Sequence, residues 1–342
     1  MLARGGAAPL LIERSEGPHD VVCGAFLGWD ALAALGRLGI DATALGARPI
    51  GHLRLFAGKR SGEVRLPHAA AGLSRRLLDE ALIERASAAG AAIERGVTAQ
   101  RVEGLKVELR DGAVLQADAL FLATGKHELR GLARPRDAAG DDPAVGLRIA
   151  LAPSPSLSHR LGGMIELHMF DRGYAGLLLQ EDGSANLCLS VAASRLAEAG
   201  GRPEALIEAL AAEAPALAER FGMAGRWIAV AGVPYGWRAA ATEAGVFRLG
   251  DQAAVIASLA GDGVAIALGS GRAAAEQYLR DGPAGAASYQ RAFAARAARP
   301  LRIASTLRTL GENPRLAPPL TALFGRIPAA AALLARLTRI GG

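Results

Sequence analysis

The chain has 342 residues, of which 51% are hydrophobic, 21% charged and 4% aromatic; this composition excludes a disordered chain or a coiled coil and predicts one large or two ordinary domains. The 39 lysines and arginines against 33 acids leave a charge of +6, but they are spread along the chain, which disfavours a nucleic-acid-binding protein. Cys23 and Cys188 have neither metal-ligand nor disulfide spacing, so we expect a reducing cytoplasm and no metal.

The first ninety residues predict strands and helices in alternation. Residues 8–13 predict a short apolar strand that ends in an acid, and helical periodicity follows over 30–38 and stops at Gly39. Alternation over 54–66 predicts a pair of strands around a tight turn. Residues 74–89 give the clearest helix, because Ser74 can cap its first turn.

The middle of the chain is richer in strands. Strand patterns resume at residue 92, with a hairpin turn at Asp111-Gly112, and a buried strand over 118–123 runs into Gly125. A connector rich in Pro, Asp and Gly covers 134–143. The elements expected after it are at least four alternating strands over 146–191, a helix over 204–221, strands over 227–233 and 246–249, and a long helix opening at 261–264.

The last segment, residues 323–342, mixes Leu and Ile with Arg326, Arg336 and Arg339 at helical spacing. A helix that closes over the protein's own core would have this pattern, and we favour that interpretation, but it leaves peripheral membrane contact open. No stretch reaches about 18 uninterrupted apolar residues, so we expect no membrane span. The first 17 residues lack the form of a signal peptide.

The strongest local signal joins the end of a strand to the start of a helix. Gly250-Asp251 ends the strand over 246–249, and the glycine-rich residues 261–264 follow about ten residues later. An Asp after a strand can accept hydrogen bonds from sugar or ribityl hydroxyls, and glycines at a helix start let free N–H groups approach an electron-rich ligand edge. An ordinary strand, turn and helix would give the same pattern.

Other candidate site residues have two interpretations each. Glu13 ends a strand, where dinucleotide folds place the acid that binds ribose, although solvated acids end many strands. The small residues 123–125 would let backbone pass close to a ligand or make a plain turn. The basic residues within 126–130 would neutralise phosphates or form a solvated loop, which we favour. Tyr235 and Trp237 would face a cofactor or pack in the core.

Four segments of the chain, in this order, carry a resemblance to a known family. They are LIERSEGPHDVVCGAFL, LSRRLLDEALIERA, ADALFLATGKHELRG and RLGDQAAVIASLAGDGVAIALGSGRAAAE. Together they resemble the flavoprotein superfamily of geranylgeranyl reductases and aromatic-ring hydroxylases, and most of all the geranylgeranyl-reductase-like FAD-dependent oxidoreductases. The resemblance covers nearly the whole chain.

The resemblance implies an α/β fold with a Rossmann-like, three-layer βαβ domain for FAD and a second, mixed or antiparallel sheet domain for substrate. The implied FAD-binding domain spans 1–45, 67–145 and 236–282, and the substrate domain spans 46–66 and 146–235. Residues 283–342 would form a C-terminal helical segment.

The resemblance also implies the roles of site residues. Glu13 would hold the adenosine ribose, the Cys23-Gly24 segment would lie near the flavin, and Asp251 would hold the ribityl and pyrophosphate part. The implied cofactor-binding set is Glu13, Arg14, Cys23, Gly24, Arg75, Val97, Thr98, Thr124, Gly125, Gly250, Asp251, Gly261, Gly263 and Val264. The substrate candidates are Tyr174, Tyr235 and Trp237, whereas no catalytic acid or base can be assigned.

One departure from the family bears on the cofactor. The family opens with a strand and a GxGxxG-type turn that holds the pyrophosphate, and this sequence shows neither. We therefore expect either an FAD-dependent oxidoreductase or, as the alternative, an N-terminally truncated member that keeps the fold without binding FAD. The enzyme would reduce a double bond in, or hydroxylate, an apolar, isoprenoid or other lipid-like substrate, with NAD(P)H open as electron donor.

Overall fold

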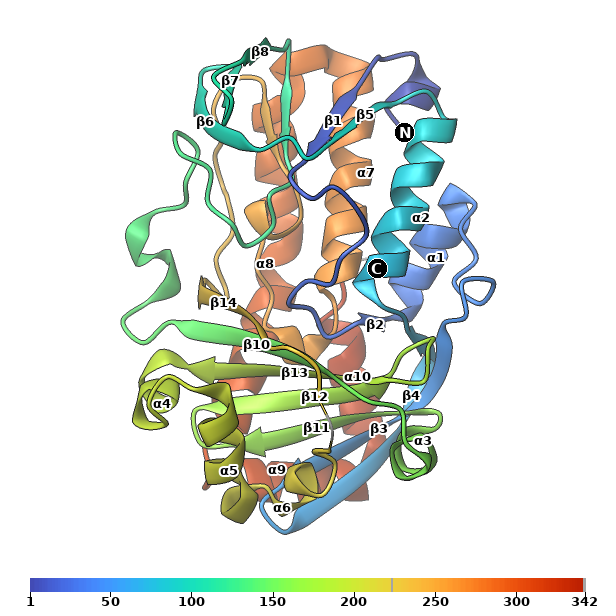
Figure 1. Cartoon of the computed structure of the whole chain (residues 1–342), viewed down its shortest axis with the longest axis vertical. Coiled ribbons are helices and arrows are strands. Elements are labelled where there is room, and N and C mark those ends of the chain that lie inside the picture. Colours follow the sequence, from blue (N-terminus) through green and yellow to red (C-terminus); the bar gives the residue numbers. More distant parts are fainter. Residues whose placement is uncertain (223, 341–342) are drawn as a thin grey trace.

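The computed structural model describes residues 1–222 and 224–340 of the chain. Figure 1 shows two lobes stacked along the long axis of the molecule. One large sheet fills the lower lobe, while short parallel strands and helices make up the upper lobe. The predicted α/β architecture with a second, mixed sheet is confirmed. Residue 223 of the predicted substrate domain and residues 341–342 of the predicted C-terminal segment lie outside the described residues.

The lower lobe is built on one eight-stranded sheet. Its strands, in spatial order, are β14 (Ile228–Val233), β10 (Ala144–Leu151), β13 (Ala185–Ala192), β12 (Gly173–Leu179), β11 (Met164–Phe170), β3 (Arg48–Ala57), β4 (Arg60–Gly72) and β2 (Phe26–Leu27). All neighbours are antiparallel except β11 and β3, which are parallel. The four strands expected over 146–191 are present, and the pair expected over 54–66 is longer than predicted.

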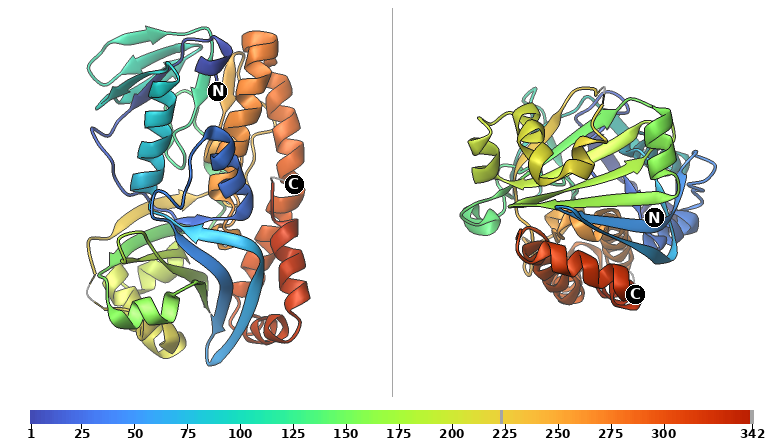
Figure 2. Two further views of the ribbon diagram at one scale, coloured as in Figure 1. Left: turned by 90° about the vertical axis from the view of Figure 1, so that its right-hand side faces the viewer. Right: turned by 90° about the horizontal axis from the view of Figure 1, so that it is seen from below.

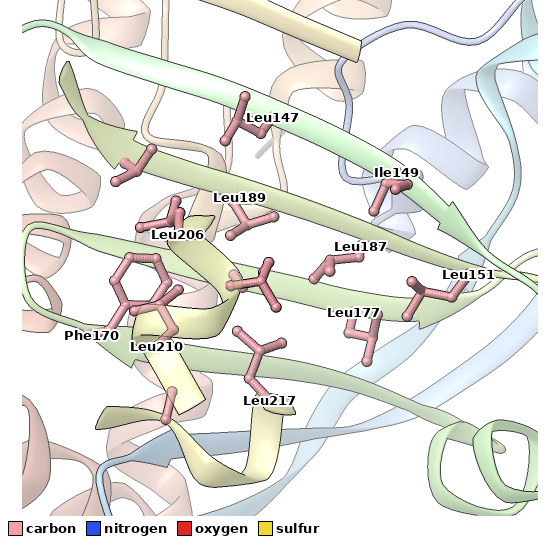
Figure 3. Close-up of a cluster of buried hydrophobic side chains, with 14 of the residues drawn as sticks. Leu147, Ile149, Leu151, Phe170, Leu177, Leu187, Leu189, Leu206, Leu210 and Leu217 are labelled. Carbon is pink, nitrogen blue, oxygen red and sulfur yellow. The ribbon is translucent and has the colours of Figure 1, made fainter. Parts of the chain in front are cut away.

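Four short helices accompany this sheet, namely α3 (Pro155–Leu161), α4 (Ala193–Glu198), α5 (Pro203–Glu213) and α6 (Pro215–Ala218). Alternate side chains of β10, β12 and β13 point toward them and form the main core, in which Leu177 and Leu187 are fully buried against Leu206 and Leu217 (Figure 3). We call the eight-stranded sheet and α3–α6 the large-sheet lobe.

The single helix predicted over 204–221 is wrong. The structure breaks it between α5 and α6, because Ala214 adopts φ −128° and ψ 66° before Pro215. A proline disfavours the helical conformation in the residue that precedes it. Pro215 instead serves as the first residue of α6, where no backbone donor is needed.

The upper lobe holds two separate pairs of parallel strands. β1 (Leu10–Glu13) pairs with β5 (Ala92–Arg95), and β9 (Leu120–Leu122) pairs with β15 (Val246–Arg248). No ladder joins the two pairs among the described residues. An antiparallel sheet of β6 (Ala99–Glu103), β7 (Lys106–Leu109) and β8 (Val114–Gln116) adjoins them, with the predicted hairpin at Asp111-Gly112.

Three helices complete the upper lobe, which we call the parallel-strand lobe. They are α1 (Trp29–Leu38), α2 (Arg75–Ala88) and α7 (Gly263–Asp281). The predicted ends of α1 and α2 are confirmed: Gly39 closes α1 at φ 79°, and Ser74 Oγ accepts a hydrogen bond from Leu77 N at 3.3 Å. The limits of the two predicted domains stay predictions; β2 and the end of β4, assigned to the FAD-binding domain, are hydrogen-bonded in the large sheet.

The remaining helices are α8 (Ala286–Gly311), α9 (Ala317–Arg326) and α10 (Pro328–Leu337). α8 runs along both lobes, and α9 and α10 lie on the face of the large sheet opposite α5 and α6 (Figure 2). Among the described residues, no single helix is long and apolar enough to cross a membrane. α9 and residues 329–337 of α10 meet the length and composition criterion only together, with a bend of 110° between them.

Candidate functional site

The strand ends of the β9–β15 pair carry the first part of the site. Gly250 and Asp251 follow β15, and Lys126, from the loop after β9, donates a hydrogen bond from Nζ to Asp251 Oδ2 at 2.8 Å. Burial disfavours the charged Lys126, but the Asp251 carboxylate outweighs it and raises the lysine pKa above its usual value. The prediction of a solvated loop is therefore wrong for Lys126, which is mostly covered, whereas His127 and Arg130 are exposed.

A buried amide ties these two strand ends together. Gln252 is fully buried, and its Nε2 lies 3.0 Å from both Thr124 Oγ1 and Gly125 O. Its Oε1 is buried and has no partner within the described part of the chain. Arg134 Nη1 donates to Asp251 O at 2.8 Å and covers the same loop. Sequence reasoning missed both Gln252 and Arg134, because the bonds from Gln252 to Thr124 and from Arg134 to Asp251 join residues more than a hundred positions apart.

The start of α7 is open to a ligand. Asp262 precedes the helix, but its side chain caps no helical amide and binds the C-terminal segment instead. A side chain at Gly263 would meet nothing within 4 Å, whereas one at Gly261 would lie 2.7 Å from the ring of Phe26. Val264 packs into the apolar cluster below α1. The first amides of α7 therefore remain available, as an anion or electron-rich edge requires.

The loop between β1 and β2 brings Cys23 to the same region. Asn186 Nδ2 of β13 donates to Cys23 O at 3.0 Å, and the Arg75 guanidinium contacts the Cys23 thiol and pairs with Asp79 at 2.8 Å. Burial opposes the charge of Arg75, but Cys23 and Asp79 outweigh it and raise its pKa. A side chain at Gly24 would meet nothing within 4 Å. The loop thus places the open backbone of Gly24 near the positively charged Arg75 side chain.

The residues expected around an adenosine lie farther out, at the tip of β1. Val97 N donates to Glu13 O at 3.0 Å, so Glu13 and the Val97-Thr98 segment are brought together. The Glu13 carboxylate accepts a hydrogen bond from the backbone N–H two residues further on. Arg14 donates to His127 Nε2 at 3.0 Å, which links the tip of β1 to the loop after β9.

The substrate candidates divide between two environments. The buried Tyr174 hydroxyl accepts a hydrogen bond from Leu259 N at 3.0 Å, and Tyr235 bonds Ser258 Oγ at 2.7 Å. Burial raises the pKa of Tyr174 well above its ordinary value. The two tyrosines therefore converge on the turn before α7, and Tyr174 holds that turn. Trp237 is partly buried and packs, with Tyr235, against a small core at the end of β14; its role toward a substrate stays a prediction.

The described residues fit one end of an FAD molecule. Open backbone at Gly24, Gly125 and Gly263, the uncapped start of α7 and the orphaned Gln252 Oε1 suit the ring and ribityl part. The pyrophosphate end is different. The two parallel pairs are not joined, and no strand with a glycine-rich turn lies between them in the described ranges.

A cavity of about 620 Å³ opens between the loop that joins β1 to β2 and the edge of the large sheet. Arg148 and Asp20 line this cavity and form an ion pair at 3.0 Å. The other lining residues are His19, Ala150, Arg226, Trp227, Ile228 and Ala229. Among the described residues, no group of three or more His, Cys, Asp or Glu side chains could hold a metal ion.

No protein-family model matches the sequence, and no curated protein matches it significantly. Solved structures do share its fold. A geranylgeranyl bacteriochlorophyll reductase-like protein from Thermoplasma acidophilum has a TM-score of 0.77 at 18% identity, over 98% of this chain and 90% of that one. The flavin-dependent brominase Bmp2 has a TM-score of 0.75 at 15% identity, over 99% of this chain and 88% of that one.

PqsL of Pseudomonas aeruginosa, a probable FAD-dependent monooxygenase, is a third similar structure. Its complex with 2-aminobenzoylacetate has a TM-score of 0.70 at 18% identity, over 94% of both chains. The resemblance inferred from the sequence is thus confirmed at the level of the fold. The residue roles implied by the resemblance stay predictions.

Proposed function

We propose that the chain is an FAD-dependent oxidoreductase whose flavin ring lies between the two lobes. One observation carries the proposal: the ends of β9 and β15 place Asp251, paired with Lys126, near glycines with open backbone and the uncapped start of α7. Ligands of open α/β folds bind at the carboxyl ends of parallel strands. Flavin enzymes with the same fold support this assignment.

FAD would supply the redox chemistry, and the protein would supply position and charge. The start of α7 would face the pyrimidine edge, where the helix dipole stabilises negative charge. Asp251 would accept hydrogen bonds from ribityl hydroxyls, and the Lys126 ammonium, held charged by Asp251, would balance the phosphates. Arg75, held by Asp79 and Cys23, would keep a second positive charge near the ring.

The substrate we propose is apolar, isoprenoid or otherwise lipid-like. Ile50, Ala70 and Leu178 of the large sheet form an apolar cluster with Phe26, close to the start of α7. Apolar linings with few polar groups are typical of sites for such molecules. Double-bond reduction and monooxygenation both remain in the proposal, with NAD(P)H as a candidate donor, since similar structures include a reductase-like protein and a probable monooxygenase.

A second candidate is a protein that keeps the fold without holding FAD. The separation of the β1–β5 pair from the β9–β15 pair favours it, because the described residues include no strand with a glycine-rich turn between the pairs. A segment upstream in the reading frame that supplies a strand and a glycine-rich turn would remove this objection.

The visible absorbance of the purified protein tests both candidates. The 342-residue chain and a form extended upstream in its reading frame are purified side by side, and released flavin is identified by chromatography. FAD in both forms would support the enzyme, whereas FAD only in the extended form would support the second candidate for the 342-residue chain and the enzyme for the extended form. Absence of flavin from both, even after incubation with FAD, would contradict it.

The Asp251→Ala variant tests the site itself. We expect retained FAD to fall by about tenfold or more with the fold intact, because an acceptor is lost and no core volume. Asp118→Ala is the matched control, since Asp118 is an exposed acid next to β9. We expect Glu13→Ala to lower the retained FAD by less than Asp251→Ala does, since it removes a contact at the far end of the cofactor. Equal flavin content in Asp251→Ala and the parent protein would overturn the site.

A further inference from the structure

The two C-terminal helices form a hairpin that is fixed on one side and open on the other. α9 packs on β3 and β4, where Ala317 and Thr321 are buried and Thr321 O would lie 2.6 Å from a side chain at Gly62. α10 turns away at 110° and packs on β4 and α8. The predicted closure over the protein's own core is therefore present, but it uses only one face of each helix.

The outer face of the hairpin carries large apolar side chains. Leu323 of α9 is 45% exposed, and the residues that flank the helix, Leu316 and Ile327, are 44% and 49% exposed. Leu333 of α10 is 56% exposed. These four residues are the hairpin ridge. Four of the nine exposed large hydrophobic residues in the described chain thus fall within 18 residues of sequence.

The charge along the sequence of the hairpin has one sign, and Glu63 of β4, which lies against Gly325 of α9, is paired with Arg54. No Asp or Glu follows Glu312 in the sequence, whereas Arg315, Arg326 and Arg336 are exposed beside the ridge. None of these three arginines forms an ion pair within the ranges that the structure describes. An apolar ridge with arginines around it matches a surface that is apolar below and anionic above, as in a membrane with acidic headgroups.

We propose that the hairpin ridge docks this protein onto the surface of an anionic lipid membrane. The hairpin lies in the interface and does not cross it, because each helix of ten residues is about 15 Å long, half of a bilayer core. Leu323, Ile327 and Leu333 enter the acyl boundary, while the arginines bind lipid phosphates. The proposal is independent of FAD binding, since no candidate cofactor residue belongs to the hairpin.

Vesicle co-sedimentation tests the apolar contribution. The protein is mixed with phosphatidylcholine vesicles containing about one-third phosphatidylglycerol, and with vesicles of phosphatidylcholine alone. We expect binding only to the anionic vesicles. The double variant Leu323→Gln/Leu333→Gln should lose about tenfold or more of this binding. The matched control is Leu279→Gln/Val114→Gln, which alters exposed residues (42% and 59%) far from the hairpin and should bind like the parent.

Charge is tested separately. Arg326→Gln/Arg336→Gln should weaken anionic binding by roughly tenfold or more and reduce its salt dependence, whereas the exposed pair Arg280→Gln/Arg302→Gln should have little effect. Circular dichroism and thermal unfolding confirm that each variant folds. Failure of the parent protein to bind anionic vesicles, or equal binding by the Leu323→Gln/Leu333→Gln variant, would overturn the proposal. So would a dimer of the parent that this variant converts to a monomer without any vesicle binding.

Discussion

The two lobes differ in how their strands find partners. In the large-sheet lobe, each of the six strands between β14 and β2 is hydrogen-bonded on both sides, and alternate side chains fill one core. In the parallel-strand lobe, β1 is bonded only to β5 and β9 only to β15 in the described chain, and Leu10 and Leu11 of β1 are 45% and 38% exposed. A continuous hydrogen-bonded ladder holds the first lobe together, whereas side-chain bonds at the strand ends hold the second.

Truncation of one leucine in each lobe should show the difference in stability between the two lobes most clearly. Leu177→Ala in the main core should cost about 3–4 kcal/mol of unfolding free energy, because the side chain is fully buried and leaves a cavity. Leu10→Ala in β1 should cost less than about 1 kcal/mol. Chemical denaturation of both variants measures the difference. A loss of about 3 kcal/mol for Leu10→Ala would mean that β1 is covered in solution.

Acid should act first on the large-sheet lobe through Glu166. This buried carboxylate accepts hydrogen bonds from Arg220 Nε at 2.8 Å and from His168 Nε2 at 3.2 Å. Burial alone would raise its pKa, but the bonds from His168 and Arg220 outweigh burial and lower the pKa from 4.5 to about 2. The folded state therefore binds this proton less readily than the unfolded state. The stability it contributes is present above pH 4.5 and is lost as the pH falls toward 2.

Glu166→Gln tests this cluster at neutral pH. We expect a loss of about 3 kcal/mol, since the buried Arg220 loses its buried partner and keeps only the exposed Glu219. The stability of the variant should also fall less steeply than that of the parent below pH 4.5. Glu63→Gln is the control, because Glu63 pairs with Arg54 at the surface and should contribute less than about 1 kcal/mol. Equal losses in the two variants would contradict the assignment.

The parallel-strand lobe should respond to pH in the opposite direction through Asp262. Burial raises the pKa of this carboxyl to about 7. The charge of Arg339 lowers the pKa and that of Asp30 raises it, but burial has the largest effect. Its proton is held in the folded state between pH 3.8 and about 7, so the stability it contributes falls as the pH rises through that range. Asp262→Asn should gain about 3 kcal/mol relative to the parent between pH 4.5 and pH 8, measured by urea unfolding. A constant difference would show that Asp262 is already ionised at low pH.

The contrast between the lobes also marks what the sequence can predict. The ends of α1 and α2 were predicted because Gly39 and Ser74 act on the nearest turn of the chain. The turn at Pro215 was missed, since apolar periodicity continues across it while the backbone does not. The strands of the large sheet were found by alternation, and their spatial order required the structure.

The candidate site was predicted in its glycines and acids but not in its connections. Gly250, Asp251 and Gly263 form a short pattern along the chain, and the family resemblance gave them roles. Lys126 and Gln252 bind partners 125–128 residues away, and no local pattern carries such a contact. Long-range side-chain bonds are therefore the part of this site that only the folded structure supplies.

The smallest effect should come from the contact between the tips of the two strand pairs. Burial lowers the pKa of His127, and the charges of Arg14, Lys126 and Arg134 lower it further. Arg14→Ala should raise this pKa, measured by NMR titration of the ring protons, and should change the free energy of unfolding by less than about 0.5 kcal/mol because the contact is exposed. Arg130→Ala, which removes an exposed charge from the same loop, should leave the pKa of His127 where it was. Equal pKa values in the parent and Arg14→Ala would mean that the tip of β1 moves independently of the loop after β9. The parallel-strand lobe would then behave as two separate pairs even at the strand ends where the proposed cofactor lies.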